Sequence, residues 1–180
     1  MPTSLADLSR LLDPHYLDKM EELPVEDIRR MRTECQHAEA ALSYLRRLIQ
    51  GRMDIVHAYV EQADAGTAPD LSSVVDNLAG ILAGPGRPSG PGRNPVLYSP
   101  DTEEMAQLTV ELDAILGADE IALLATRSTE DLRALADQMH ELEVRVSGER
   151  HGLHERIDAL QAELVKRHKS GQASVDGLLP

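Results

Sequence analysis

Two long stretches, each with an apolar stripe at heptad spacing, constrain the fold of this chain more than any other feature. Between Pro24 and Gln62 there is no further proline, and apolar or small side chains recur at steps of three and four. They are Ile28, Met31, Cys35, Ala38, Leu42, Leu45, Ile49, Val56 and Tyr59, with Arg52 in the one gap. A second stripe, interrupted at Glu149, comprises Leu132, Leu135, Met139, Leu142, Val146, Leu153, Ile157, Leu160 and Leu164. Each stripe predicts a helix about 60 Å long, which needs a partner to cover its apolar face.

Proline, glycine and helix-capping residues divide the chain around these two helices. Pro24, followed by two acidic residues, is a good start for the first helix, and Ser128 with Asp131 is close to a capping box for the second. We expect five segments: an N-terminal arm (1–23), the first long helix (24–64), a linker region with short helices (65–128), the second long helix (129–170) and a C-terminal tail (171–180).

The linker region is predicted to contain both short helices and irregular chain. Residues 84–100 hold four glycines and five prolines, which forbid regular structure. Short helices are predicted at 71–83, 101–116 and 118–126. The simplest architecture folds the two long helices back on each other. The predicted fold is therefore all-α, a long antiparallel two-helix coiled coil with shorter helices between.

Composition limits the kind of protein. There is no Trp, no Phe and only four Tyr, which suits thin helix-on-helix seams better than a thick globular core. A net charge of −13 argues against direct binding to nucleic acid and suits a basic protein partner, although acidity can also serve solubility alone. A single cysteine, no signal-peptide pattern and no membrane-spanning run favour a cytoplasmic protein with no membrane association.

The two long helices share a polar pattern besides their apolar stripes. Both follow the spacing E-x3-S-x2-R-x3-(Q or H)-x3-D, and steps of 4, 3, 4 and 4 keep all five side chains on one face beside the stripe. The first row is Glu39, Ser43, Arg46, Gln50 and Asp54, and the second is Glu143, Ser147, Arg150, His154 and Asp158. In an antiparallel hairpin the rows face one another around a local pseudo-two-fold axis. A single row is typical of a solvated face with i,i+4 ion pairs, but two matched rows favour a ligand.

The residue types point to a guanine nucleotide with two-fold symmetry. Arginine matches the O6/N7 edge of guanine, and carboxylates accept from its N1–H and N2–H₂ groups. Serine and glutamine suit phosphate or ribose oxygens. Cyclic di-GMP carries two guanines, two phosphates and its own two-fold axis, so it fits both rows.

At these positions the sequence closely resembles the RsiG family of bacterial anti-sigma factors, whose signature is a twice-repeated E(X)3S(X)2R(X)3Q(X)3D motif on an antiparallel coiled coil. The resemblance implies that a cyclic di-GMP dimer binds between the helices, and that the loaded protein sequesters a WhiG-type sigma factor and restrains sporulation. His154 departs from the family's glutamine. It can still donate a hydrogen bond, but its protonation state matters near neutral pH, so the departure bears on the symmetry of the two half-sites.

The mechanism that the resemblance implies is a ligand-gated clamp. With Arg46 facing Arg150, the empty rows are expected to pack imperfectly, and ligand would fix the helix spacing. The class-different alternative is a coiled-coil adaptor or scaffold with no small ligand. An enzyme is not expected, because the chain has no HExxH motif and no P-loop. A metal site at His151, His154 and Asp158 lacks cysteines or a second histidine pair opposite. The apolar end of the tail, Leu178-Leu179, is either a frayed terminus or a docking peptide.

Overall fold

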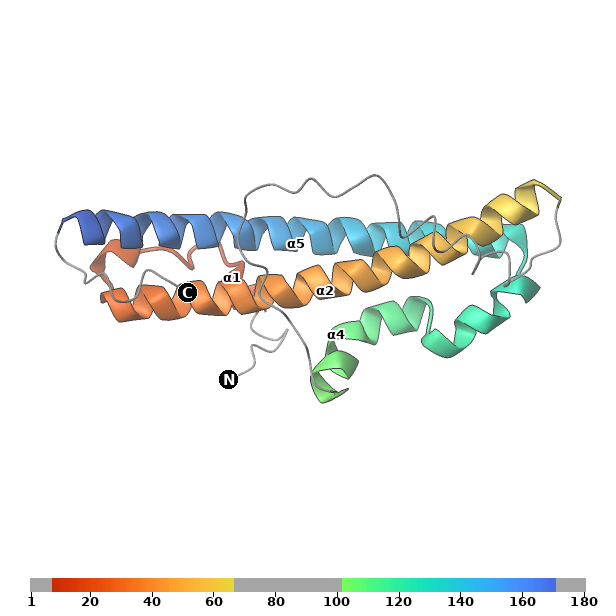
Figure 1. Ribbon diagram of the computed structural model, residues 1–180, viewed down its shortest axis with the longest axis horizontal. Coiled ribbons are helices and arrows are strands. Elements are labelled where there is room, and N and C mark those ends of the chain that lie inside the picture. Colours follow the sequence, from red (N-terminus) through yellow and green to blue (C-terminus); the bar gives the residue numbers. More distant parts are fainter. Residues whose placement is uncertain (1–7, 67–101, 171–180) are drawn as a thin grey trace.

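The computed structural model describes residues 8–66 and 102–170, and within these ranges every regular element is helical (Figure 1). Two long helices lie side by side, α2 (Val25–Asp64) and α5 (Thr129–Lys169). The shorter elements are α1 (Leu8–Leu11), the 3₁₀ helix η2 (Met20–Glu22), α4 (Thr102–Ile115) and the 3₁₀ helix η3 (Ala118–Thr126). This arrangement confirms the predicted all-α fold with a long two-helix hairpin.

The ends of the long helices follow the local signals. Pro24 occupies the N-cap of α2, and Glu26 and Asp27 stand in its first turn, where the helix dipole favours negative charge. The Ser128 hydroxyl caps α5 by accepting a hydrogen bond from the Asp131 backbone N–H at 3.1 Å. Four basic or imidazole side chains, Lys166 to Lys169, occupy the last turn of α5. Both helices therefore begin and end close to where their sequences predict.

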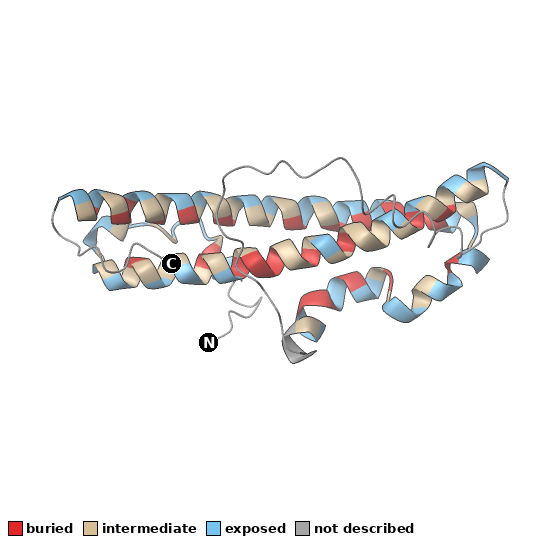
Figure 2. Ribbon diagram, in the orientation of Figure 1, coloured by how far each residue is buried: buried red, intermediate tan, exposed pale blue. Residues whose placement is uncertain are grey.

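Pairs of residues across the hairpin establish that it is antiparallel. Asp64 at the end of α2 bonds Arg133 near the start of α5 at 2.5 Å, and Arg32 near the start of α2 bonds Gln161 at 2.5 Å. Between the helices the two stripes are buried, apart from Met31, which is partly buried (Figure 2). Each fully buried Leu or Ile contributes about 1.5–3 kcal/mol relative to exposure. The seam therefore supplies the stability that isolated helices of this length lack.

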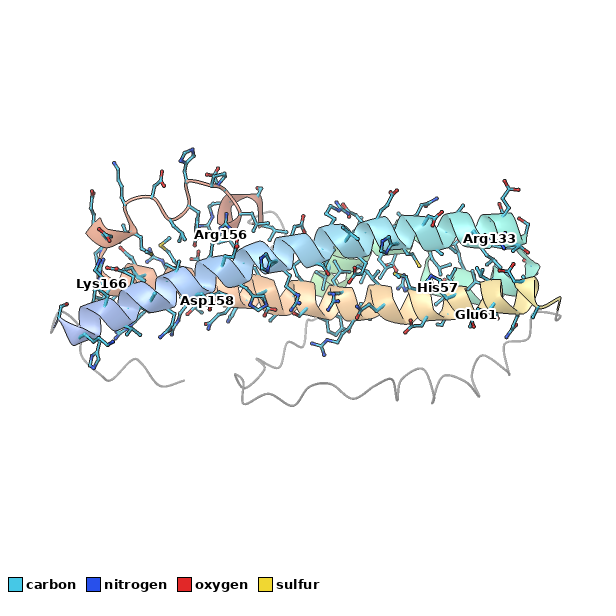
Figure 3. The ribbon with its side chains drawn as sticks, turned by 90° about the horizontal axis from the view of Figure 1, so that it is seen from above. His57, Glu61, Arg133, Arg156, Asp158 and Lys166 are labelled. Atoms are coloured by element: carbon cyan, nitrogen blue, oxygen red, sulfur yellow. The ribbon has the colours of Figure 1, made fainter. Side chains whose placement is uncertain are left out.

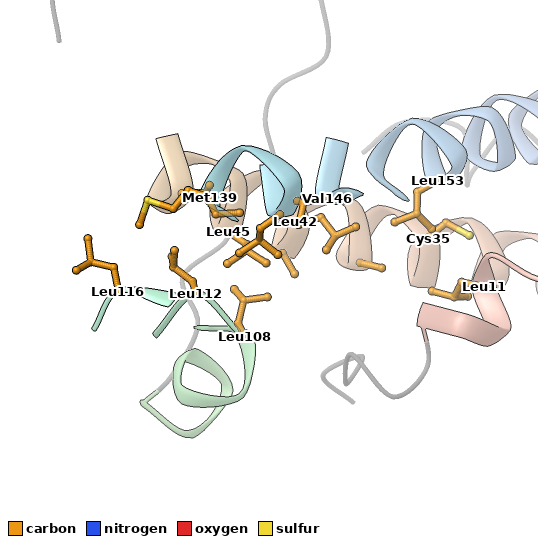
Figure 4. Close-up of a cluster of buried hydrophobic side chains, with 14 of the residues drawn as sticks. Leu11, Cys35, Leu42, Leu45, Leu108, Leu112, Leu116, Met139, Val146 and Leu153 are labelled. Carbon is orange, nitrogen blue, oxygen red and sulfur yellow. The ribbon is translucent and has the colours of Figure 1, made fainter. Parts of the chain in front are cut away.

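Helix α4 covers one side of the seam and explains its polar gap at Arg52. Leu108, Leu112 and Leu116 are buried in the same core as the seam residues (Figure 4). Arg52, which fills the gap in the first stripe, bonds Asp113 at 2.7 Å and donates to the Leu116 carbonyl. Arg52 therefore faces the segment 102–126, which packs on the hairpin. The predicted helix 71–83 and the linker 84–100 lie outside the described residues.

The described part of the N-terminal arm is fastened along the other half of α5. The Arg156 guanidinium donates to the carbonyls of Leu12 at 2.6 Å and Asp13 at 3.2 Å, just past the end of α1. The Arg167 guanidinium donates to the carbonyls of Leu23, Met20 (3.0 Å) and Glu21 (2.9 Å) around η2. Cationic donors thus bind carbonyls at or near the ends of these short helices; the carbonyls of Asp13 and Met20 also accept a backbone N–H from Tyr16 and Leu23.

All these covering elements lie on one side of the hairpin, here called the back face. On α5, Arg145, Arg156 and Arg167 follow at steps of eleven, which is about three turns and returns to the same side. Arg145 bonds Glu111 of α4, and the other two hold the arm. Figure 3 shows Arg156 on the arm side of α5 and Asp158 on the opposite side. The second polar row lies on that opposite side, here called the front face.

Candidate ligand-binding site

On the front face the two polar rows interlock as two four-residue networks. Each network takes two residues from α2 and two from α5, and a shift of 104 positions in the sequence exchanges one network for the other. The Gln50 half consists of Arg46 and Gln50 from α2 with Glu143 and Ser147 from α5. The His154 half consists of Glu39 and Ser43 from α2 with Arg150 and His154 from α5. The predicted pseudo-two-fold relation is therefore present in the contacts.

In the Gln50 half, three donors converge on one oxygen of Glu143. Arg46 Nε donates to Glu143 Oε1 at 2.7 Å, Ser147 Oγ at 3.0 Å and Gln50 Nε2 at 3.4 Å. Burial acts to raise the pKa of the Glu143 carboxyl, but the hydrogen bonds from Arg46 and Ser147 outweigh it. The net pKa of Glu143 lies below its ordinary value. This carboxyl is therefore held ionised by its partners.

In the His154 half, the equivalent contacts converge on one oxygen of Glu39. Ser43 Oγ donates to Glu39 Oε1 at 2.7 Å, Arg150 Nη1 lies 3.3 Å from it and His154 Nε2 lies 3.2 Å from it. Arg150 Nη1 also lies 3.5 Å from Ser43 Oγ and 3.4 Å from His154 Nε2. Glu39 and Glu143 expose only 20% and 16% of their side chains, so water competes weakly for these contacts.

The last residue of each row lies outside the networks. Asp54 and Asp158 are exposed, one helical turn beyond Gln50 and His154 respectively. Of the ten predicted site residues, the structure therefore brings eight into two compact networks and places two carboxylates at their outer ends. Their proposed part in ligand binding stays a prediction.

The pairing of the arginines differs from the sequence-based expectation. Arg46 and Arg150 do not oppose each other, because each bonds the glutamate of the other helix. The side chains of the two rows thus largely satisfy one another rather than being generally mismatched. The antiparallel arrangement supplies the reason: the first residue of each row lies within reach of the arginine of the other row, so Arg46 bonds Glu143 and Arg150 bonds Glu39. The repeated Glu and Arg of the motif could have indicated this exchange.

The site carries four carboxylates and two guanidinium groups, besides hydroxyl, amide and imidazole groups. Such a set can offer bidentate donors to a guanine edge or a phosphate and acceptors to guanine N–H groups. Among the described residues, no group of three or more His, Cys, Asp or Glu side chains is arranged to hold a metal ion. His151 instead lies 3.5 Å from Glu155 on its own helix. The front face therefore offers hydrogen-bond donors, hydrogen-bond acceptors and groups of both charges.

Two further properties bear on the class of protein. Within 8–66 and 102–170, none of the helices combines the length and the apolar character that crossing a membrane requires. Cys35, the one cysteine of the chain, is fully buried in the seam. Burial raises the pKa of its thiol, which makes the thiolate less available. Cys35 is thus a core residue, as its place in the first stripe predicts.

Comparison with known proteins identifies the family. The sequence profile described as RsiG-like matches residues 14–82 and 119–180, which include both polar rows. No curated protein matches the chain. The match covers most of the chain and both helices of the hairpin, and the chain therefore belongs to the RsiG-like family of anti-sigma factors.

Proposed function

We propose that the front face binds cyclic di-GMP, as a dimer, and that the loaded protein sequesters a WhiG-type sigma factor and so restrains sporulation genes. The observation that carries this proposal is the pair of equivalent networks around a pseudo-two-fold axis. A two-fold symmetric ligand with two guanines and two phosphates can make the same contacts in both halves. A structural coiled coil has no need for two matched sets of Glu, Ser, Arg and Gln or His.

Binding would proceed by exchange of partners at the arginines. In the structure, Arg46 and Arg150 bond Glu143 and Glu39. A phosphate or a guanine O6/N7 edge would take those donors in a bidentate arrangement. The released glutamates, with the exposed Asp54 and Asp158, would accept from guanine N1–H and N2–H₂. Each side chain of the networks thereby keeps a partner in the bound state.

A switch requires that the ligand bind the sigma-competent state better than the other state. The cross-helix pairs help to set the relative position of α2 and α5. Exchanging them for contacts to one ligand would change that position and fix it. A sigma-binding surface that includes both helices would then form only with ligand.

The distribution of charge supports a basic protein partner. Residues 53–66 and 105–144 hold 12 Asp or Glu against 2 Arg, a net charge of −10, whereas residues 8–52 and 145–170 together have a net charge of +2. The acidic residues thus gather at the end of the rod where α2 ends and α5 begins (Figure 1). Sigma factors bind DNA, and surfaces that bind DNA are basic. Electrostatic attraction of this kind favours fast and selective association.

The proposal is tested by capture of the protein on an immobilised WhiG-type sigma factor, with and without cyclic di-GMP. Arg46→Ala/Arg150→Ala removes both network arginines. Arg47→Ala/Arg133→Ala is the matched control, since it likewise removes one arginine from each long helix, in both cases an exposed one. We expect wild type and control to be captured only with ligand, and the Arg46→Ala/Arg150→Ala variant not to be captured.

Other outcomes have distinct meanings. Equal capture with and without ligand would favour the coiled-coil adaptor. No capture of wild type under either condition would refute the proposed partner. Ligand-dependent capture that survives loss of both network arginines would place the ligand elsewhere on the protein.

A further inference from the structure

The two halves of the front-face site are equivalent in composition except at one position, and their geometry differs there. In the Gln50 half, Arg46 Nε donates to Glu143 at 2.7 Å, which is typical of a strong charge-assisted hydrogen bond. In the His154 half, the three contacts of Arg150 Nη1 are longer, at 3.3, 3.4 and 3.5 Å. The Arg150 Nε atom is buried and has no hydrogen-bond partner within the described part of the chain. Arg150 is therefore the less satisfied of the two arginines.

The exchange of glutamine for histidine accounts for this difference. A glutamine has an NH₂ donor and a separate carbonyl acceptor, so it can donate to a glutamate and accept from an arginine at once. His154 meets both Glu39 (3.2 Å) and Arg150 (3.4 Å) through the same atom, Nε2. If Nε2 carries a proton, it can donate to Glu39 but cannot accept from the N–H of Arg150. If Nε2 is unprotonated, it can accept from Arg150, but its lone pair repels the carboxylate of Glu39.

Protonation of the whole ring does not remove the conflict. The imidazolium would strengthen the contact with Glu39 on α2, but it would repel Arg150 on its own helix, one turn away. Asp158, one turn to the other side, is the remaining charged group of the row near His154. In every protonation state, His154 Nε2 therefore makes a favourable contact with only one of its two neighbours, Glu39 or Arg150. The contacts of the arginine across the helices are thus weaker in the His154 half than in the Gln50 half.

We infer that His154 makes the two half-sites unequal, and that the half containing Arg150 takes up its guanine nucleotide first and more tightly. This inference rests on the proposed function, because cyclic di-GMP is the ligand. Binding in the His154 half gives Arg150 Nε a partner that it lacks and exchanges only long contacts. Binding in the Gln50 half breaks the 2.7 Å bond between Arg46 and Glu143. The free energy of exchange therefore favours the His154 half.

The inference is tested by calorimetric titration of cyclic di-GMP into single arginine variants in two backgrounds. In the natural background, we expect Arg150→Ala to weaken binding about tenfold more than Arg46→Ala, a difference of about 1.4 kcal/mol. In a His154→Gln background, both halves carry glutamine, and the losses should agree within about threefold. Equal losses in the natural background, or an inequality unchanged by His154→Gln, would overturn the inference.

A reciprocal exchange provides a second test that keeps both arginines. The variant Gln50→His/His154→Gln moves the histidine to the other half and preserves the composition of the site. We expect the order of sensitivity to reverse, so that Arg46→Ala becomes the more damaging change. An unreversed order would refute the role of the histidine. Failure of wild type to bind cyclic di-GMP at all would refute the proposed function instead, so the two failures are distinguishable.

Discussion

The front and back faces of the hairpin use arginine in different ways. On the back face, Arg156 and Arg167 of α5 donate to backbone carbonyls of the arm. On the front face, Arg46 and Arg150 bond the side chains of Glu143 and Glu39. A backbone carbonyl of the arm cannot move away from its arginine without a change in the fold of the arm. A carboxylate on a neighbouring helix can rotate away, so its arginine can exchange partners. The comparison indicates that Arg156 and Arg167 maintain the structure and that Arg46 and Arg150 can exchange partners.

The largest expected effect on stability is that of Arg167→Ala. Arg167 and Glu163 expose only 8% and 7% of their surface, and Arg167 also donates to three carbonyls. Removing it should lower the free energy of unfolding by about 3 kcal/mol. The low end of the range for buried pairs applies because Lys166, 3.4 Å from Glu163, still partners that carboxylate. Denaturant unfolding measures the change, with Arg133→Ala as a surface control expected to cost below about 1 kcal/mol. A loss no greater than that of the control would break the comparison.

On the front face, removing an arginine should lower the free energy of unfolding less than removing Arg167 does. Glu39 and Glu143 keep serine and amide or imidazole partners when the arginines are removed. We expect Arg46→Ala and Arg150→Ala each to lower the free energy of unfolding by about 1 kcal/mol, below the cost of Arg167→Ala alone. The same denaturant series measures this. If either variant proved as destabilising as Arg167→Ala, the front networks would be structural rather than exchangeable.

The smallest expected effect is the pH dependence contributed by Glu143. Burial opposes ionisation of this carboxyl, but the bonds from Arg46 and Ser147 set its pKa below the ordinary value. A carboxyl whose pKa is lower when folded stabilises the folded state above its unfolded pKa, and this contribution disappears as the pH falls through the folded pKa. Glu143→Gln should therefore lower stability at neutral pH and converge with wild type in acid. Unfolding curves between pH 7 and pH 3 measure the difference. A gap that stays constant or widens toward acid would contradict the assignment.

The sequence predicts the long helices and the two rows well because both depend on local periodicity. Steps of three and four place Leu42, Leu45 and Ile49 on one stripe whatever the partner. The same rule places Ser43 and Arg46 beside that stripe. Helix ends follow from Pro24 and Ser128, which act over a single turn. These features require no knowledge of how distant segments meet.

The partners of individual side chains could not be predicted in the same way. In the sequence, Arg52 interrupts the apolar stripe without an evident partner. In the structure it bonds Asp113 of α4 and the carbonyl of Leu116, which follows that helix. Arg156 and Arg167 look like ordinary surface charges of a helix, because the carbonyls that they bind lie more than 140 residues away. The exchange between Arg46 and Glu143 depends on the register of the hairpin. Such pairings require the tertiary arrangement, which local patterns do not contain.

The measurement that tests the account most directly is calorimetric titration of cyclic di-GMP into three proteins. They are wild type, the front-face variant Arg46→Ala/Arg150→Ala and the matched control Arg47→Ala/Arg133→Ala. The account predicts saturable binding to wild type and control, and no measurable heat of binding to the front-face variant when its far-ultraviolet circular dichroism still shows a folded hairpin. Undiminished binding to the folded front-face variant, or equal loss in the control, would contradict the claim that the two networks form the ligand site.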